Sequence, residues 1–365
     1  MLNKHKHSYG ERKILIFFLL IILLQLLYSS NFTPVLQSIK NINFVLIFIF
    51  LPAAFVILFE SAGWYFSLKI KKEKLHFTKL YLLRTAIDSI HYSVPGGFAA
   101  AELLRPLLLK RNMGIEINRG IASGIVTKLS IAIAQLLFII TGIAFMLIFY
   151  NEGTAHIQGI SDNLIYILSG SFILGVFCLT IFLYKYDGLI KTFSLLKKIK
   201  LGLPKKITAR TEERVFEINN YIRKFNSDGA YRLICTILLF FMGWMTIAAE
   251  SLLIFRIIGA DLSFSQIIIL ESAASLIRII FFFLPSGLGA QDAGLIGMMS
   301  AMGIADPVSV SILFISYKRT KEIIWIIFGY ILLFRFGLNP MKLYLSKFRK
   351  SLKRGEIRLI FSQAE

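Results

Sequence analysis

The sequence predicts an all-α polytopic membrane protein, built from inverted repeats with two proline-broken re-entrant helical hairpins. Hydrophobic residues make up 56% of the 365 residues, more apolar surface than a soluble domain can bury. One Pro–Gly motif occurs twice between apolar runs. Lysine and arginine gather beside the apolar runs, which is the pattern of the positive-inside rule. Together these three observations favour a transporter-like architecture.

The duplicated motif reads PGGFAAAE from Pro95 and PSGLGAQD from Pro285. In both copies a proline breaks an apolar segment, glycine follows, and a carboxylate comes seven positions after the proline. The offset, 285 − 95 = 190, also relates other residues in register, which predicts an internal repeat of roughly 100 residues. The further pairs are Glu60 with Glu250, Ser61 with Ser251, and Lys128 with Lys318.

The apolar runs and the basic segments between them predict five parts. No A-x-A cleavage site follows the first apolar run, 14–30, so we expect a retained helix there. The parts are an N-terminal cytoplasmic segment with the first transmembrane helix (1–43), a first repeat (44–150) with a broken hairpin at 80–112, a transmembrane helix and basic cytoplasmic amphipathic loop (151–232), a second repeat (233–336) with a broken hairpin at 265–302, and a basic cytoplasmic tail (337–365).

The positive-inside rule orients these parts in the cytoplasmic (inner) membrane. It places the N-terminus, the loops 69–79 and 185–232, and the C-terminus in the cytoplasm. The first hairpin has basic residues on both flanks and so opens to the cytoplasm. The flanks of the second hairpin, 259–264 and 303–308, have none, so it opens to the exterior. Two repeats of opposite orientation are the plan of many secondary transporters.

The breaks in the two hairpins expose bare backbone. Proline removes a backbone donor, and in hydrocarbon an unsatisfied backbone group costs several kcal/mol. We therefore expect both breaks to lie buried and close together, with the N-termini of the restarting helices directed at a ligand. The helix-break residues are Pro95, Gly96, Gly97, Pro285, Gly287 and Gly289.

Ionisable residues also lie in or beside the apolar segments. Each costs roughly 3 kcal/mol at the bilayer centre, which favours a functional interpretation. An excess of cations suits an anionic headgroup, such as a lipid phosphate, held by Lys128, Lys318 and Arg319. The candidate substrate-binding residues are Glu102, Arg105, Lys128, Arg278, Asp292, Lys318 and Arg319, with Glu60 and Glu250 as symmetry-related buried carboxyls.

Local packing is the alternative interpretation of these charges. Arg84 with Asp88, Glu102 with Arg105, and Lys318 with Glu322 stand three or four positions apart and could be ion pairs within one helix. Glu60 and Glu250 have small neighbours and could be hydrogen-bonded packing carboxyls. The basic stretch 191–226 predicts interfacial amphipathic helices attracted to anionic lipids, with docking of a protein partner as the alternative.

Composition argues against several other classes. The net charge of +20 lies beside apolar runs, which favours membrane topology and not nucleic acid as its cause. The two cysteines, Cys178 and Cys235, fall in apolar runs, and the five histidines have no metal-ligand spacing. We therefore expect no metal and no cofactor.

The run from Pro285 to Gly294, followed by Gly303 and Lys318-Arg319, resembles the membrane domain of the lysylphosphatidylglycerol synthase family. That family includes the multiple peptide resistance factor and stand-alone flippase-like proteins. Its first motif, a Pro–Gly break followed by Glu, is similar to Pro95-Gly96-Gly97 with Glu102, whereas Asp292 stands where the family usually has Glu. The resemblance spans roughly residues 10–340.

The resemblance implies a flippase-like membrane domain without aminoacyl transfer. The synthases carry a soluble catalytic domain after the membrane part, and about thirty residues follow residue 335 here. We expect a protein that moves an anionic lipid or lipid-linked headgroup between leaflets, and that attracts anionic lipids at its cytoplasmic face. One alternative is an intramembrane lipid-modifying transferase using Glu102 and Asp292. Another is a non-transporting partner of a separate glycosyl- or lipid-modifying enzyme, which would dock through residues 185–232.

Overall fold

The computed structural model describes residues 45–68, 76–93, 97–150, 170, 216–221, 230–281, 289–304 and 306–336. Within these ranges the elements are helices and no strand occurs, which confirms the predicted all-α class. Several predicted features lie outside the described residues. They are the first helix (14–30), the span at 163–184, most of the basic loop 185–232, the tail 337–365, and the break residues Pro95, Gly96, Pro285 and Gly287.

The first four described helices combine two long apolar helices with a short pair. The segments Ile49–Ser67 and Ile117–Met146 are long and apolar enough to cross a membrane. The short pair have 17 residues each, fewer than the roughly 20 that a span needs. Lys79, near the start of one, donates a hydrogen bond to the carbonyl of Asn112, near the end of the other, so the two run antiparallel. The helices are α3 (Val45–Ser67), α4 (Phe77–Ser93), α5 (Gly97–Met113) and α6 (Ile117–Tyr150).

The second four helices follow the same order, a long apolar helix, a short pair and a long helix. They are α10 (Ala230–Ile258), α11 (Phe264–Ile280), α12 (Ala290–Ala301) and α13 (Pro307–Arg335). Within α10, Tyr231–Ile258 is apolar and long enough to span. Local sequence sets the starts: Ser263 and Gln266 form a capping box before α11. Asp306 caps α13, whose first residue is Pro307.

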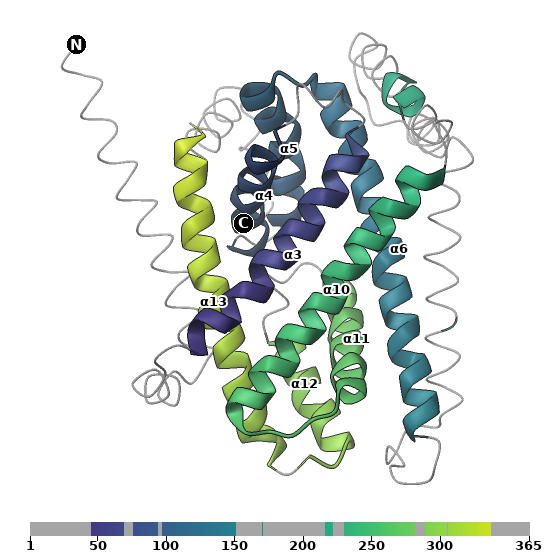
Figure 1. Cartoon of the computed structure of the whole chain (residues 1–365), viewed down its shortest axis with the longest axis vertical. Helices are drawn as coiled ribbons and strands as arrows, with labels where there is room; N and C mark the ends of the chain where they lie inside the picture. Colours follow the sequence, from purple (N-terminus) through teal and green to yellow (C-terminus); the bar gives the residue numbers. More distant parts are fainter. Residues whose placement is uncertain are drawn as a thin grey trace, which may run out of the picture.

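These eight helices form one bundle, with α3 and α10 packed side by side and running diagonally through its middle (Figure 1). The pair α4 and α5 lies toward one end of the bundle, and the pair α11 and α12 lies toward the opposite end. The long helices α6 and α13 run along opposite sides. In this arrangement α13 packs against α4, and α6 packs against α11. Each long outer helix therefore contacts a short helix of the other group.

Glycines allow these two crossings to be close. A Cβ built on Gly142 of α6 would lie 2.1 Å from Oγ of Ser272 on α11. A Cβ built on Gly329 of α13 would lie 2.6 Å from the carbonyl oxygen of Thr85 on α4. Small residues play this part where membrane helices pack, since lipid supplies no hydrophobic force between them. The same crossings are joined by hydrogen bonds, one of them Ser93 with Tyr330 at 2.7 Å.

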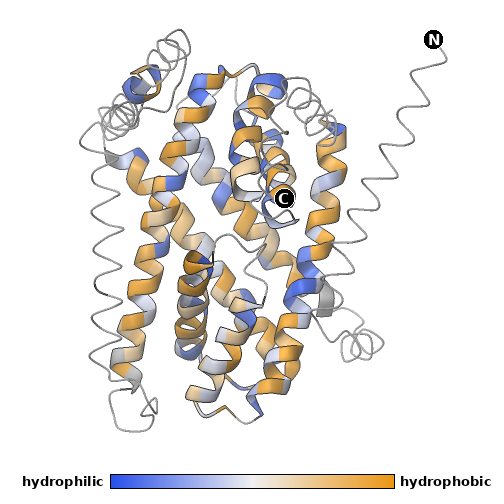
Figure 2. Ribbon diagram, turned by 180° about the vertical axis from the view of Figure 1, so that it is seen from behind, coloured by the Kyte–Doolittle hydropathy of each residue, from blue (hydrophilic) through white to orange (hydrophobic). Residues whose placement is uncertain are grey.

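Apolar side chains dominate the surface as well as the core. Figure 2 shows hydrophobic residues along most of the helices, with hydrophilic residues at helix ends and at a few turns inside the bundle. On α10, Ile234, Leu238 and Met242 are exposed at a spacing of four residues. Such a stripe on a long apolar helix is typical of contact with lipid.

A short helical segment of the basic loop, 216–221, docks at one end of the bundle. Ile218 packs against Ala122 and Val126 of α6. The hydroxyl of Tyr221 donates to the carbonyl oxygens of Ser67 and Leu68, where α3 leaves acceptors unsatisfied. Burial raises the pKa of Tyr221 to about 12, so its hydroxyl stays protonated and remains a donor.

Candidate functional site

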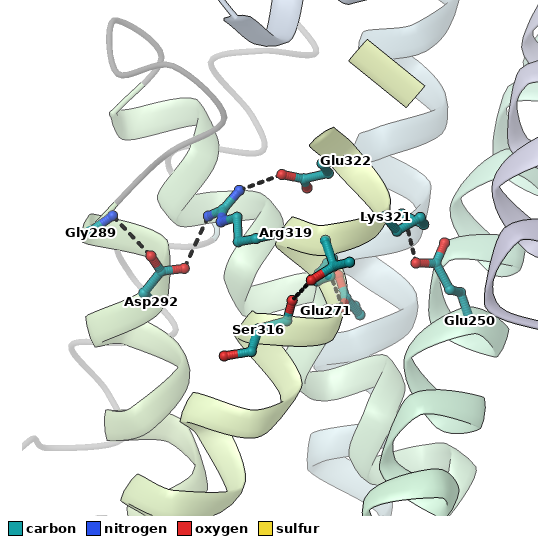
Figure 3. Close-up of polar contacts among 10 residues, drawn as sticks. Glu250, Glu271, Gly289, Asp292, Ser316, Arg319, Lys321 and Glu322 are labelled. Carbon is teal, nitrogen blue, oxygen red and sulfur yellow. Dashed lines mark hydrogen bonds and ion pairs between the residues drawn. The ribbon is translucent and has the colours of Figure 1, made fainter. Parts of the chain in front are cut away.

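A short stretch of α13, residues 318–322, carries cations that reach the three other helices of the second group. Figure 3 shows that Arg319 points toward α12, whereas Lys321 points to the other side of α13, toward α10. Each cation is paired with a carboxylate, so the charged stretch holds four helices together. The pairs are Lys318 with Glu271 of α11 (Nζ to Oε1, 2.7 Å), Arg319 with Asp292 of α12 (Nη2 to Oδ1, 3.0 Å), and Lys321 with Glu250 of α10.

Arg319 is shared between two carboxylates. Its Nη2 donates to Asp292, and its Nη1 donates to Glu322 Oε2 at 2.7 Å. Asp292 also accepts from the backbone N–H of Gly289 at 3.1 Å, at the start of α12. There Gly289 has φ 79°, a backbone conformation that glycine adopts without strain. The planar fork of arginine suits this double pairing, which fixes the start of α12 against α13.

A small cavity lies between α11, α12 and α13. Its volume of about 20 Å³ admits a water molecule, and it is too small for a lipid headgroup. Glu271 is buried there: Oε1 accepts from Lys318 and from Ser251, while Oε2 has no partner. The cavity is therefore a small site with charged side chains in its lining. The polar residues that line it are Glu271, Gln291, Asp292, Lys318, Arg319 and Glu322.

A second cluster joins α5 and α6 in the first group. Glu102 Oε1 lies 3.0 Å from Lys128 Nζ and 3.3 Å from Arg105 Nη2. The Arg105 guanidinium lies over the ring of Trp64 on α3, 5.0 Å from the ring centroid, a favourable cation–π position. The side chain of Lys128 is 41% exposed, whereas that of Arg105 is 2% exposed. The cluster thus runs from the surface into the core.

A third set of charges connects α3 with α4. Arg84 donates to Glu60 at 2.6 Å and to Asp88 at 2.9 Å. The Arg84–Asp88 pair within one helix is therefore present, but the same guanidinium also bridges two helices. Glu60 and Glu250 also connect helices, because each forms an ion pair with a cation from another helix.

Ion pairs among the described residues place the predicted site residues in two groups. Glu102, Arg105 and Lys128 lie together, and so do Asp292, Lys318 and Arg319; none of the residues lining the cavity comes from the first group. The last candidate, Arg278, lies with its guanidinium over the ring of Trp244, 5.7 Å from the centroid.

Of the break residues, Gly97 and Gly289 are described. A Cβ at Gly97 would lie 2.3 Å from the carbonyl oxygen of Ile90 and 2.7 Å from that of His91. The backbone of α5 therefore approaches the end of α4 so closely that no other residue fits without movement. The requirement for glycine at Gly97 comes from this contact between α4 and α5.

Three charged residues of the site, Glu271, Lys321 and Glu322, were not among the predicted substrate-binding residues. Each is an ionisable residue within an apolar segment, the same signal that identified the others. Trp64 gives no such signal, since an aromatic residue in a membrane helix is ordinary. Among the described residues, no group of three or more His, Cys, Asp or Glu side chains is placed to hold a metal ion.

Apolar helices of spanning length and ion pairs inside the bundle define a helical membrane protein with a charged interior. The chain belongs to the family described as the lysylphosphatidylglycerol synthase TM region, whose model matches residues 13–316. The match includes Glu102, Arg105, Lys128 and Asp292 and ends two residues before Lys318. No curated protein and no solved structure matches the chain. The predicted family is thereby confirmed, and it is a membrane domain linked to lipid and flippase-like functions.

Proposed function

We propose that the protein is a flippase-like transporter that moves an anionic lipid, or a lipid-linked anionic headgroup, between leaflets of the inner membrane. The observation that carries the proposal is the set of ion pairs inside an apolar bundle, centred on residues 318–322 of α13. Each buried charge costs free energy in a membrane protein and marks a pathway for a polar group more often than a packing device. Family membership adds the link to lipids.

The helix order supports an inverted repeat. Adding the offset of 190 to each helix of the first group gives a range close to a helix of the second. The packing is also exchanged between groups: α3 contacts α4 as α10 contacts α11, and α13 contacts α4 as α6 contacts α11. The shifted and observed ranges are 235–257 with Ala230–Ile258, 267–283 with Phe264–Ile280, 287–303 with Ala290–Ala301, and 307–340 with Pro307–Arg335.

The short helix pairs at opposite ends of the bundle support re-entrant hairpins, one opening to each side of the membrane (Figure 1). In this proposal the headgroup reaches the interior from one side and leaves from the other, as the two hairpins move in turn. The cavity of about 20 Å³ then belongs to a closed state. It opens when the headgroup phosphate competes with Asp292 and Glu322 for Arg319.

The basic loop favours a second role at the cytoplasmic face. Segment 216–221 is held against α3 and α6 by Tyr221 and Ile218. In the proposed orientation the lysines and arginines of the loop attract anionic lipids. The same loop is the surface on which a separate lipid- or glycosyl-modifying enzyme would dock, if the protein assists an enzyme and does not transport.

Reconstituted lipid movement tests the proposal. Liposomes containing the purified protein and a trace of fluorescent phosphatidylglycerol, phosphatidic acid or phosphatidylcholine are treated with dithionite, which bleaches only the outer leaflet. We expect protein-dependent loss of the inner-leaflet signal for an anionic lipid and at least a tenfold slower loss in Arg319→Gln. Arg256→Gln is the matched control, because Arg256 pairs with Asp261 at the surface. Rates equal to those of protein-free liposomes for every lipid would reject transport and favour the docking role.

A further inference from the structure

We propose that Arg105 and Lys128 form the oxyanion site for the headgroup phosphate, and that the carboxylate of Glu102 occupies this site until the ligand displaces it. The inference rests on the proposed function for the identity of the ligand, an anionic lipid. The site itself rests on the geometry of α5 and α6. In this proposal the carboxylate of Glu102 competes with the phosphate for the two cations and does not contact the substrate.

Arg105 has donors with no acceptor. Its Nε and Nη1 are buried and make no hydrogen bond to any residue that the structure describes, and its Nη2 lies near Glu102 at the long distance of 3.3 Å. Nearly all buried donors in folded proteins have a partner, so each exception needs an explanation. Beside it, the indole N–H of Trp64 is also buried without a partner. Three of the four unpaired atoms of Arg105, Trp64 and Glu102 are donors; the fourth is Oε1 of Glu102, which lies at ion-pair distance from both cations. This surplus of donors indicates that the missing group is an acceptor.

The balance of charge distinguishes this cluster from the one on α13. One carboxylate, Glu102, serves two cations in the first cluster. In the second, one cation, Arg319, serves two carboxylates. In these direct ion pairs two cations therefore face one carboxylate beside Arg105, whereas two carboxylates face one cation at Arg319. An anion gains most at the first site.

The exposure of the three side chains and the space beside them would allow an anion to enter beside Lys128. Exposure falls from 41% for the Lys128 side chain to 28% for Glu102 and 2% for Arg105. A Cβ built on Gly124 of α6 would lie 3.4 Å from Glu102 Oε2 and 3.9 Å from Arg105 Nη1. A space of the size of a methyl group, or of one phosphate oxygen, thus lies beside both side chains.

Displacement follows from this arrangement. A phosphate that enters beside Lys128 takes the place of the Glu102 carboxylate between the two cations. Its oxygens accept from Nη2 of Arg105, which Glu102 leaves, and from one of the two unpaired neighbours, Nε or Nη1. Each of these forms with Nη2 a fork that binds phosphate in a bidentate manner. The freed Glu102 turns toward the exposed end of the cluster. Neutralising Glu102 should therefore strengthen binding of the anion, whereas neutralising Lys128 or Arg105 should weaken it.

Binding is measured on the full chain in dodecyl maltoside, a detergent without phosphate. The probe is a short-chain fluorescent phosphatidylglycerol, and the readout is its dissociation constant by polarisation. We expect about tenfold tighter binding for Glu102→Gln and at least tenfold weaker binding for Lys128→Gln and Arg105→Gln. Glu116→Gln is the control for net charge, because it removes one negative charge from an exposed pair with Arg119; its affinity should equal that of the wild type.

Two competitors separate the sources of the phosphate group. Short-chain phosphatidylglycerol without the label should displace the probe, and neutral short-chain diacylglycerol should not. Displacement by sodium phosphate at a similar concentration would support the same site with a free anion as its ligand. Equal displacement by diacylglycerol would overturn the proposal, because binding would then come from the acyl chains alone.

The sign of the Glu102→Gln effect decides the role of this residue. If Glu102→Gln binds the probe more weakly, while its elution volume in gel filtration is unchanged, Glu102 supports the structure of the site. That result would overturn the proposal that Glu102 competes with the phosphate. Should Arg105→Gln fail to fold, Lys128→Gln and Gly124→Val test the site, and unchanged affinity in both would refute it. Retained binding without lipid movement in liposomes would leave the site standing and reject only the transport function.

Discussion

The crossing of α6 and α11 provides a quantitative test of the packing between the two helix groups. In Gly142→Ala the new Cβ would lie 2.1 Å from Oγ and 2.4 Å from Cβ of Ser272, whereas carbon contacts are most favourable near about 3.5–4 Å. Extra volume in a packed core costs about 1–3 kcal/mol. Replacing glycine by alanine within a helix returns about 0.5–1 kcal/mol. We expect the free energy of unfolding to fall by about 1–2 kcal/mol.

Unfolding in mixed micelles of dodecyl maltoside and SDS measures this change. Ser272→Gly removes both colliding atoms, so adding it to Gly142→Ala should recover most of the loss in a double-mutant cycle. Gly297→Ala is the control: no atom lies within 4 Å of a Cβ there, and we expect stability unchanged or raised by up to about 1 kcal/mol. If Gly142→Ala is as stable as Gly297→Ala, or if Ser272→Gly brings no recovery, α6 and α11 do not approach as described.

Three further predictions concern buried charge, pH and topology. Lys321→Ala leaves Glu250 buried without its cation and should cost about 3–5 kcal/mol of unfolding free energy, much of it recovered by adding Glu250→Gln; equal losses in single and double variants would refute the pairing. The pKa of Tyr221 is raised to about 12, so the stability its neutral hydroxyl provides is present below pH 10 and lost as the pH rises toward 12; Tyr221→Phe should abolish that alkaline loss in a thermal-unfolding profile. In a chain without its native cysteines, Ala155→Cys should react with a membrane-impermeant maleimide from outside and Lys200→Cys only after lysis; labelling of both from one side would contradict the predicted topology.

The general placement of the helices and of several charges could be predicted from the sequence. Hydrophobic runs and proline breaks define helix positions because burial of apolar side chains decides what crosses a membrane. Glu102 and Lys128 were predicted to belong to one site, and they lie 3.0 Å apart. The two side chains form an ion pair because an ionisable residue within an apolar segment must find a partner inside the protein.

The choice of partner could not be predicted in the same way. Lys318 was expected to correspond to Lys128 and to act beside Asp292, yet it pairs with Glu271, and Arg319 pairs with Asp292. Neighbouring positions on a helix differ by about 100° in direction, so a small rotation of α13 decides which carboxylate each cation meets. We also expected an excess of cations at the centre of the bundle, and that expectation came from counting charged residues in the sequence. In the described part of the folded chain, two cations share one carboxylate at the cluster of Glu102, Arg105 and Lys128.

The charged stretch of α13 has a consequence for anyone who builds chimaeras from related membrane domains. Its three cations form ion pairs with carboxylates on three separate helices, Glu271, Asp292 and Glu250. A donor helix transplanted in place of α13 must therefore match α10, α11 and α12 at once, with a cation in the right position for each. Swapping the whole of residues 230–336 keeps all three matches, whereas an exchange point within 302–307 separates every cation from its carboxylate. Hybrid proteins joined before α10 should remain functional where those joined before α13 fail, even when the two parents are similar in hydropathy throughout.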